Sequence, residues 1–263
     1  MKPNLNVTAV SLALAALFTS PALAADAAKP TAPNADAILR QMSSTLVGAR
    51  EFSFAAHRQI DAALLAGHDL PTDAHVAVTV QHPNKLAARS TSKGDVRDFY
   101  FDGRSLTLVD VTKNLYSTVP MRTSLDGLVE ELDQKYGFTP PLAELALSNV
   151  YADIRWKARS ISYQGEGTVG GFFGVGGVAC HRLALSGKVL DAELWVGVDD
   201  HLPRKLVAAA KTRAGKPQIK VEFSDWNLAA KATAQDFTFV PPKGAMKITM
   251  ATTAEMTGKH KKH

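Results

Sequence analysis

The chain contains little cysteine and few aromatic residues. It contains a single cysteine, Cys180, among 263 residues, so no disulfide can form within it. Aromatic residues make up only 7% of the sequence, although hydrophobic residues together reach 46%. A domain of this length can bury about 70% of its unfolded surface. The fold is therefore expected to be stabilised by its hydrophobic core alone.

A long uninterrupted apolar run is also missing. The longest, residues 7–18, follows Lys2 and contains two hydroxyl residues, whereas a membrane-spanning helix needs about 18 or more apolar residues. Pro21 and then Ala22-Leu23-Ala24 come after it, the order typical of a secretory signal. We predict a signal peptide over residues 1–24, cleaved after Ala24, a periplasmic location, and no transmembrane anchor after cleavage.

The chain has no strong excess of either charge. Its formal net charge is +5, and removal of a signal that holds one lysine and no acid would leave +4. The dense basic cluster lies at the carboxyl end, in residues 259–263. Nucleic-acid-binding proteins concentrate cations on one face or arm, so no nucleic-acid partner is expected. Residues 249–263 are predicted to be a solvated basic tail.

The mature chain begins with a leader of small residues and prolines, residues 25–33, which is expected to be flexible. Ile38, Met42, Leu46 and Ala49 then recur at helical spacing, with Asp36 available as an early cap. From Phe52 the pattern changes to the period of two that is typical of a strand with one buried face.

Alternating segments dominate the rest of the chain. Asp102-Gly103 lies between two of them and predicts a tight hairpin, because glycine accepts a positive φ without strain. Short antiparallel strands at this spacing indicate a mainly β (α+β) domain over residues 34–248, built on one curved sheet or open barrel. The strands expected from this pattern are 52–56, 76–80, 99–101, 106–111, 115–119, 177–185, 192–198, 205–212 and 218–227.

A helical segment interrupts the strands from Ser124 to Leu147. Ser124 can cap a helix that Gly137 ends, and Pro140-Pro141 begins a second short helix. An apolar helix face within an antiparallel sheet must be buried on that sheet or over a cavity in it. We expect this segment, with the first helix, to form a movable cover. The expected contact residues are Leu125, Leu128, Val129 and Leu132 on the helix, facing Val76, Val78, Leu194, Val196, Val221 and Phe223 on the sheet.

Several segments, in this order, resemble the lipoprotein-carrier (LolA/LolB-like) superfamily. They are residues 98–108, Leu115-Tyr116, and residues 180–184, 192–196, 202–207, 222–227 and 237–245. Gly176-Gly177-Val178-Ala179 ahead of Cys180-His181 is similar to the predicted periplasmic branch of that superfamily, domain of unknown function 2092. The resemblance spans roughly residues 35–248.

The resemblance implies a strongly curved antiparallel sheet, an unclosed β-barrel, with helices covering its mouth around an apolar cavity. Carriers of this superfamily shuttle lipid-modified proteins, and relatives bind other lipids or sense envelope stress. Two functions follow as expectations. The first is a periplasmic carrier that holds a lipid, acyl chain or lipoprotein anchor in an apolar cavity. The second is a non-catalytic regulatory or structural module that acts through an envelope protein partner.

Four patterns that resemble enzyme motifs lack the setting that their chemistry requires. Residues 165–170 match a dinucleotide fingerprint, but more glycines follow in place of a helix. Ser90-x-x-Lys93 lacks the companion motifs of penicillin-interacting hydrolases. Asp199-Asp200-His201 has no further metal ligands, and Cys180 and His181 are adjacent on a strand and point apart.

We therefore expect no enzyme, no cofactor and no metal site. The Gly-rich loop 165–177 is expected to be a flexible hairpin, with Phe172 and Phe173 at its tip as a possible contact with a membrane or partner. Cys180 is expected to be buried and inert, on the same apolar face of its strand as Val178.

Overall fold

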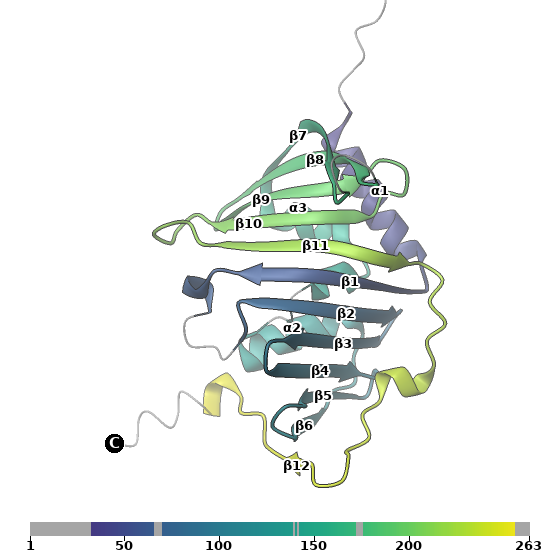
Figure 1. Ribbon diagram of the computed structural model, residues 1–263, viewed down its shortest axis with the longest axis vertical. Helices are drawn as coiled ribbons and strands as arrows, with labels where there is room; N and C mark the ends of the chain where they lie inside the picture. The colour runs from purple at the N-terminus through teal and green to yellow at the C-terminus, as the bar shows by residue number, and fades with distance from the viewer. Residues whose placement is uncertain (1–32, 66–69, 139, 141, 172–175, 256–263) are drawn as a thin grey trace, which may run out of the picture. The chain divides into compact units, whose positions relative to one another are not determined.

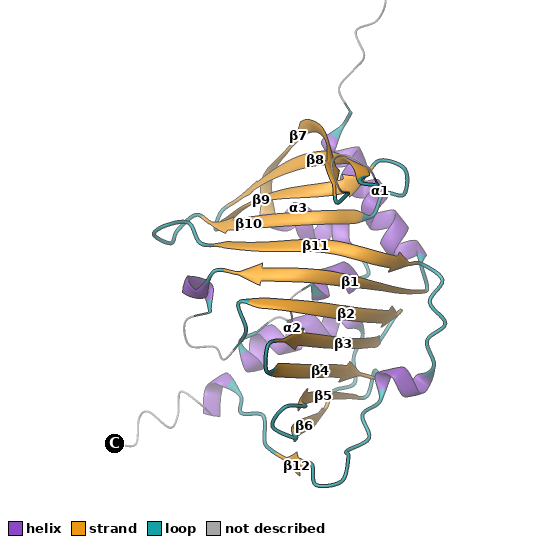
Figure 2. Ribbon diagram, in the orientation of Figure 1, coloured by secondary structure: helices purple, strands orange, loops and turns teal. Residues whose placement is uncertain are grey.

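The computed structural model describes residues 33–65, 70–138, 140, 142–171 and 176–255. Within these residues, twelve strands form one sheet in the order β12-β6-β5-β4-β3-β2-β1-β11-β10-β9-β8-β7 (Figures 1 and 2). The first six strands are β1 (Glu51–Ile60), β2 (Asp73–Gln81), β3 (Lys85–Ser92), β4 (Asp95–Phe101), β5 (Ser105–Asp110) and β6 (Leu115–Pro120). The others are β7 (Ala158–Val169), β8 (Val178–Gly187), β9 (Leu190–Gly197), β10 (Pro203–Ala210), β11 (Gln218–Asn227) and β12 (Met246–Lys247).

The sheet is antiparallel except where β12 runs parallel to β6. Its order ends at β12 on one side and β7 on the other, so the curved sheet does not close into a barrel. The helices are α1 (Ala35–Gly48), α2 (Leu125–Tyr136) and α3 (Val150–Lys157), with short 3-10 turns η1 (Ala62–Leu64), η2 (Ala143–Ala146) and η3 (Ala234–Phe237). This arrangement confirms the predicted fold class.

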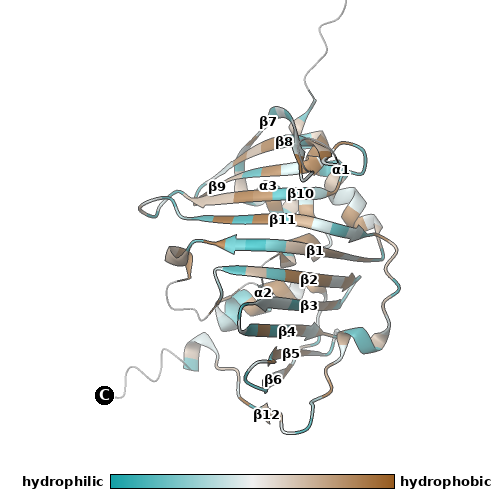
Figure 3. Cartoon of the chain, viewed as in Figure 1, coloured by the Kyte–Doolittle hydropathy of each residue, from teal (hydrophilic) through white to brown (hydrophobic). Residues whose placement is uncertain are grey.

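One face of the sheet carries the core, and we call it the inner face. Phe52, Phe54 and Ala56 of β1 are buried, while the residues between them are half-buried. The same alternation places Val78 and Val80 of β2 beside them. Helices α1 and α2 contribute to this same core (Figure 2). The half-buried residues between the buried ones of β1 point to the opposite, outer face. Hydrophilic and hydrophobic residues both occur along the strands (Figure 3).

The predicted hairpin at Asp102-Gly103 joins β4 to β5. Gly103 has a φ of +84°, and the Asp102 Oδ1 atom accepts hydrogen bonds from the backbone N–H groups of Arg104 and Ser105. Any larger residue at 103 would also place a Cβ 2.3 Å from the Asn84 side chain. Glycine is therefore required here both by the backbone conformation and by the close approach of the β2–β3 turn.

The helix predictions were partly wrong. The cap of α1 is Asn34, not Asp36, because its Oδ1 accepts hydrogen bonds from the N–H groups of Asp36 and Ala37. The segment after Pro140 forms the single 3-10 turn η2, and the helix that follows, α3, was not predicted. Only Val150 of α3 is fully buried, so the helix lacks the apolar stripe by which sequence patterns are recognised.

The segment after β11 runs along the outer face and returns to α2. Phe239 lies beside Tyr100 and Tyr116, with ring centroids 5.9 and 5.2 Å apart. After β12 the chain reaches the end of α2, where the Thr253 hydroxyl donates a hydrogen bond to the Lys135 carbonyl oxygen. The described end of the chain, in yellow in Figure 1, is thus attached to the helix that covers the sheet.

Candidate functional site

Helix α2 is positioned by its caps and by two contacts at its first turn. The Ser124 hydroxyl oxygen accepts a hydrogen bond from the Gly127 N–H at 3.2 Å, and Gly137 ends the helix in the left-handed conformation, as predicted. The Leu125 N–H donates to the Pro83 carbonyl oxygen in the β2–β3 turn. Asp126 accepts hydrogen bonds from the N–H and hydroxyl of Ser148, which link the helix to the segment before α3.

The apolar stripe of α2 rests on strands β3 and β4. Leu128 and Val129 of the helix share a small cavity with Leu86 and Phe99 of the sheet. The volume of this cavity is about 10 Å³, which is at the lower limit for a single water molecule. The helix and the sheet are therefore closely packed in this structure.

The structure brings most of the predicted contact residues into one core. Val76 and Val129 are half-buried at its margin. Eight of the ten are buried members of one continuous cluster: Leu125, Leu128, Leu132, Val78, Leu194, Val196, Val221 and Phe223. Helix α2 covers β3 and β4. In the sheet order, β1 and β2 separate these two strands from β11 and β9. Leu86 and Phe99 were not among the predicted contacts. Residues 85–92, which form β3, were not among the expected strands, and the expected strand 99–101 did not show which residues lie beneath the helix.

Aromatic side chains occupy the middle of the inner face. Trp226 stacks on Phe54 with ring centroids 4.6 Å apart, and Phe223 meets Phe54 edge-on at 5.8 Å. The Trp226 indole N–H donates a hydrogen bond to the Pro203 carbonyl oxygen at 3.0 Å. This indole is thereby held against the apolar surface with its one polar atom satisfied.

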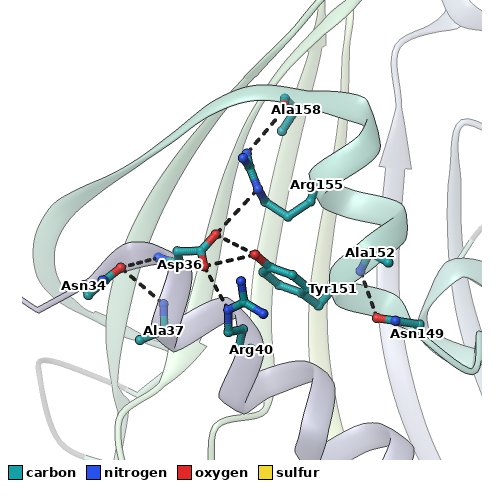
Figure 4. A network of polar contacts seen from close by, with 9 residues as sticks. All are labelled: Asn34, Asp36, Ala37, Arg40, Asn149, Tyr151, Ala152, Arg155 and Ala158. Atoms are coloured by element: carbon teal, nitrogen blue, oxygen red, sulfur yellow. Dashed lines mark hydrogen bonds and ion pairs between the residues drawn. The ribbon is translucent and has the colours of Figure 1, made fainter.

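A polar network joins α1 to α3 (Figure 4). The Asp36 carboxylate accepts hydrogen bonds from the Tyr151 hydroxyl and from Arg40 Nε, and Arg155 lies 3.5 Å away. Burial alone would raise the pKa of Asp36, but these hydrogen bonds and the two positive charges outweigh it and lower the pKa below its usual value. The start of α1 is thus fixed to the short helix by charge and hydrogen bonding.

A broad groove of about 760 Å³ is lined by outer-face residues such as His57, His75 and Arg89 and also by Val76, Phe223 and Trp226 of the inner-face row. His57 and His75 stack in its floor with ring centroids 4.7 Å apart. His57 Nε2 lies 3.0 Å from the Asp73 carboxylate, and hydrogen bonds from Gln59 and His57 lower the pKa of Asp73. Other lining residues mix charged and apolar side chains, among them Arg89, Val178, Leu202 and Glu222.

The glycine pattern at residues 165–170 has a structural explanation. Residues 165–169 belong to strand β7, and Gly167 lies against Trp195 of β9. A Cβ at 167 would lie 2.6 Å from the Trp195 ring, so only glycine allows the indole to lie flat there. The predicted loop tip with Phe172 and Phe173 lies outside the described residues.

The other motif residues occupy strands and turns. Ser90 is in β3, and Lys93 is in the turn that follows. The Asp200 Oδ1 atom accepts a hydrogen bond from the Leu202 N–H, and its carboxylate pairs with Arg204. Among the described residues, no three histidine, cysteine or acidic side chains are grouped so as to hold a metal ion.

Cys180 is fully buried, as predicted, but its surroundings differ from the prediction. It lies between Gly167 and Gly197 on the neighbouring strands, outside the main core, and Val178 is 37% exposed. Burial raises the pKa of the Cys180 thiol to about 11.

The described residues thus define a class: an unclosed antiparallel sheet whose inner face is covered by helices around an apolar core. A family model matches residues 35–251, and the chain belongs to that family, the predicted periplasmic proteins of domain of unknown function 2092. No curated protein matches the chain. No helix in the part of the chain that the structure describes is long and apolar enough to cross a membrane.

Several solved structures have a similar chain path. MucB of Pseudomonas aeruginosa, in its complex with MucA, is 13% identical with a TM-score of 0.44; the match covers 79% of this chain and 62% of that one. A LolA superfamily protein from Nitrosomonas europaea is 13% identical with a TM-score of 0.34, covering 79% and 99%. A DUF1329 family protein from Desulfovibrio piger is 11% identical with a TM-score of 0.36, covering 78% and 97%. The chain spans about 60% of the length of MucB. No function follows from likeness at this level.

Proposed function

We propose that this protein is a periplasmic carrier that holds the acyl chain of a lipid or lipoprotein between α2 and the inner face of the sheet. The observation that carries the proposal is the meeting of two apolar surfaces along a single short helix. The stripe of Leu125, Leu128 and Leu132 rests on an inner face that continues to the aromatic group around Phe54. Displacing α2 would expose a continuous apolar surface.

The closed structure requires that displacement before a ligand can bind. Pockets that bury a small apolar ligand measure about 300–1,000 Å³, whereas the cavity beside Leu128 measures about 10 Å³. The described polar contacts of α2 are mainly at its two ends, with Pro83 and Ser148 at one and Thr253 at the other. A helix of 12 residues is too short to be stable by itself in water. We expect α2 to move as a unit, so that its apolar stripe leaves the sheet and contacts the ligand.

An aqueous compartment gives such a carrier a physical purpose. Each methylene group of an acyl chain left in water costs about 0.8 kcal/mol. The family is described as periplasmic, and the amino-terminal pattern of Lys2, an apolar run and Ala22-Leu23-Ala24 supports export.

A second candidate function rests on the broad groove that His57 and His75 line. Its volume of about 760 Å³ and its mixture of histidine, arginine, acidic and apolar side chains would suit an extended segment of a protein partner. In this function the inner face is a filled core, and the protein acts as a regulatory or structural module without carrying lipid.

Titration with a fluorescent fatty-acid analogue distinguishes the two functions. The wild-type protein is expected to bind the probe, and Leu128→Gln should lose that binding while the circular dichroism of the sheet is retained. Glu130→Gln is the matched control, because Glu130 is exposed on the same helix. A wild-type protein that binds no probe, with a Leu128→Gln variant that simply unfolds, would remove the carrier function and leave the partner module.

A further inference from the structure

A buried arginine lies in the apolar row of β1. The buried positions of this strand alternate through Phe52, Phe54 and Ala56, and the next position is Arg58. Arg58 is 3% exposed, and its cross-strand neighbours Ala74 and Val221 are each 1% exposed. The aliphatic part of the Arg58 side chain therefore starts from the inner face, as the core side chains do.

This arginine has almost no polar partners. Its Nη2 atom donates one hydrogen bond to the Pro71 carbonyl oxygen at 3.1 Å, and its Nε atom has no acceptor. No acidic side chain in the described part of the chain forms an ion pair with it. The adjacent acid, Asp73, accepts its hydrogen bonds from His57 and Gln59.

A guanidinium in such surroundings is unfavourable for folding. Burial lowers the pKa of Arg58, and the charge of Asp73 offsets this in part. An arginine stays charged at any physiological pH, so the unmet Nε donor cannot be relieved by loss of a proton. A methionine of similar length would fill the same apolar position without that cost.

We propose that Arg58 binds the anionic head group, a carboxylate or phosphate, of the acyl ligand that the inner face holds. The proposal rests on the carrier function above and names the class of ligand as an anionic amphiphile. The planar fork of the guanidinium matches the two oxygens of a carboxylate or phosphate, and such charge-assisted pairs are the strongest hydrogen bonds in proteins.

The register of the sheet places the acyl chain beside this head group. Arg58 pairs with Ala74 and Val221, and the next inner position of β1, Ala56, pairs with Val76 and Phe223. An acyl chain anchored at Arg58 would thus run along β1 over Ala56 and its neighbours Val76 and Phe223, towards the strands that α2 covers. The anionic head group would then contact Arg58, and the acyl chain would contact apolar side chains.

The test compares ligands that share a chain and differ in head group. Myristate, myristyl phosphate and myristyl alcohol would each displace a fluorescent apolar probe from the full-length protein, and inorganic phosphate alone serves as the chainless anion. We expect at least one of the two anionic amphiphiles to bind about tenfold or more tighter than the alcohol. Inorganic phosphate alone should bind weakly, because the apolar chain supplies most of the affinity.

Two variants identify Arg58 as the cause of the preference. Arg58→Met should abolish the preference for the anion and raise the urea midpoint of unfolding, an increase that a merely structural arginine would not give. Arg58→Gln provides a smaller neutral replacement if the methionine does not fold. Arg50→Met, at an exposed arginine next to β1, should change neither property.

The outcomes separate this inference from the carrier function. Equal binding of anionic and neutral amphiphiles by the wild-type protein, or an anion preference that persists in both Arg58 variants, would overturn the role of Arg58 and leave the carrier. Tight binding of inorganic phosphate alone would also overturn it, since the site would then not need the chain. Absence of binding by every amphiphile would remove both.

Discussion

The Tyr151 hydroxyl lies 2.9 Å and 3.0 Å from the two carboxylate oxygens of Asp36. These residues lie at the starts of α3 and α1, more than a hundred positions apart. The Tyr151 backbone N–H also donates to the Ser43 hydroxyl oxygen of α1 at 3.0 Å. Helix α3, which its own sequence pattern does not predict, is thus joined to α1 by hydrogen bonds (Figure 4).

Replacing Tyr151 by phenylalanine is expected to destabilise the protein by about 1 kcal/mol, the usual net worth of a hydrogen bond. The effect should depend on pH. The pKa of Asp36 is lowered from 3.8, so the stability it contributes is present above that value and is lost as the pH falls through the lower, folded-state pKa. Urea unfolding of both proteins at neutral pH and in acid measures this. A difference that is the same at both pH values would mean that ionised Asp36 is not the acceptor.

Asp98 and Arg89 pair on the outer face through two hydrogen bonds of 2.7 Å. The Asp98 side chain is 4% exposed, so Arg89→Met would leave a buried carboxylate whose remaining side-chain donor, within the described residues, is the Tyr100 hydroxyl. We expect a loss of about 2–3 kcal/mol in the free energy of unfolding, below that of fully buried pairs because Arg89 is largely exposed. The double variant with Asp98→Asn should recover much of it, and failure to recover would show that the loss comes from another contact.

This pair contrasts with Arg58. Arg89→Met leaves the buried Asp98 carboxylate without its ionic partner, whereas Arg58→Met removes a buried charge that forms no ion pair within the described residues. The two changes should therefore shift the free energy of unfolding in opposite directions. The comparison is made by urea unfolding of both variants in the same buffer. A parallel loss in both would mean that the contacts of Arg58, such as its hydrogen bond to the Pro71 carbonyl oxygen, stabilise the folded state by more than the burial of its charge costs.

The Cys180 thiol is expected to react with a native thiol reagent only through unfolding. It is fully buried, and its pKa of about 11 leaves very little thiolate at neutral pH. Because this pKa is raised above 9.0, the thiol should also lower stability as the pH rises above that value. Labelling rates with and without urea test the point. Rapid labelling without urea would place Cys180 at an accessible surface.

Export is expected to remove residues 1–24. The single positive charge at Lys2 and the short apolar run are typical of a secretory signal, and Ala22-Leu23-Ala24 supplies the small residues that a signal peptidase recognises. Amino-terminal sequencing of the protein from the periplasmic fraction should begin at Ala25. A protein that begins at Met1 would contradict the envelope location on which the carrier function depends.

The sequence was informative where local chemistry decides the structure. Asp102-Gly103 defined a hairpin, Ser124 and Gly137 bounded α2, and the alternation of β1 identified the inner face. Each of these depends on neighbours within a few positions. Such local patterns can be recognised in the sequence without any knowledge of tertiary structure.

The parts that could not be predicted depend on distant residues. Helix α3 requires Asp36 and Ser43 from α1, and the choice of Leu86 and Phe99 beneath α2 depends on how the sheet curves. The alternation of β1 places Arg58 among buried positions, but the absence of an ion pair to it within the described residues depends on where their acidic side chains lie in space. A pattern of single residues does not contain that information.

The central claim is that the inner face holds the acyl chain of a ligand, and native mass spectrometry of the protein purified from the periplasm without detergent tests it most directly. The carrier function predicts a bound species that is released on denaturation and is identified as an anionic lipid or acyl chain. Leu128→Gln should lose this species, and Glu130→Gln should retain it. A wild-type protein that is recovered at the mass of the polypeptide alone, and that stays empty after incubation with myristate, would contradict the claim.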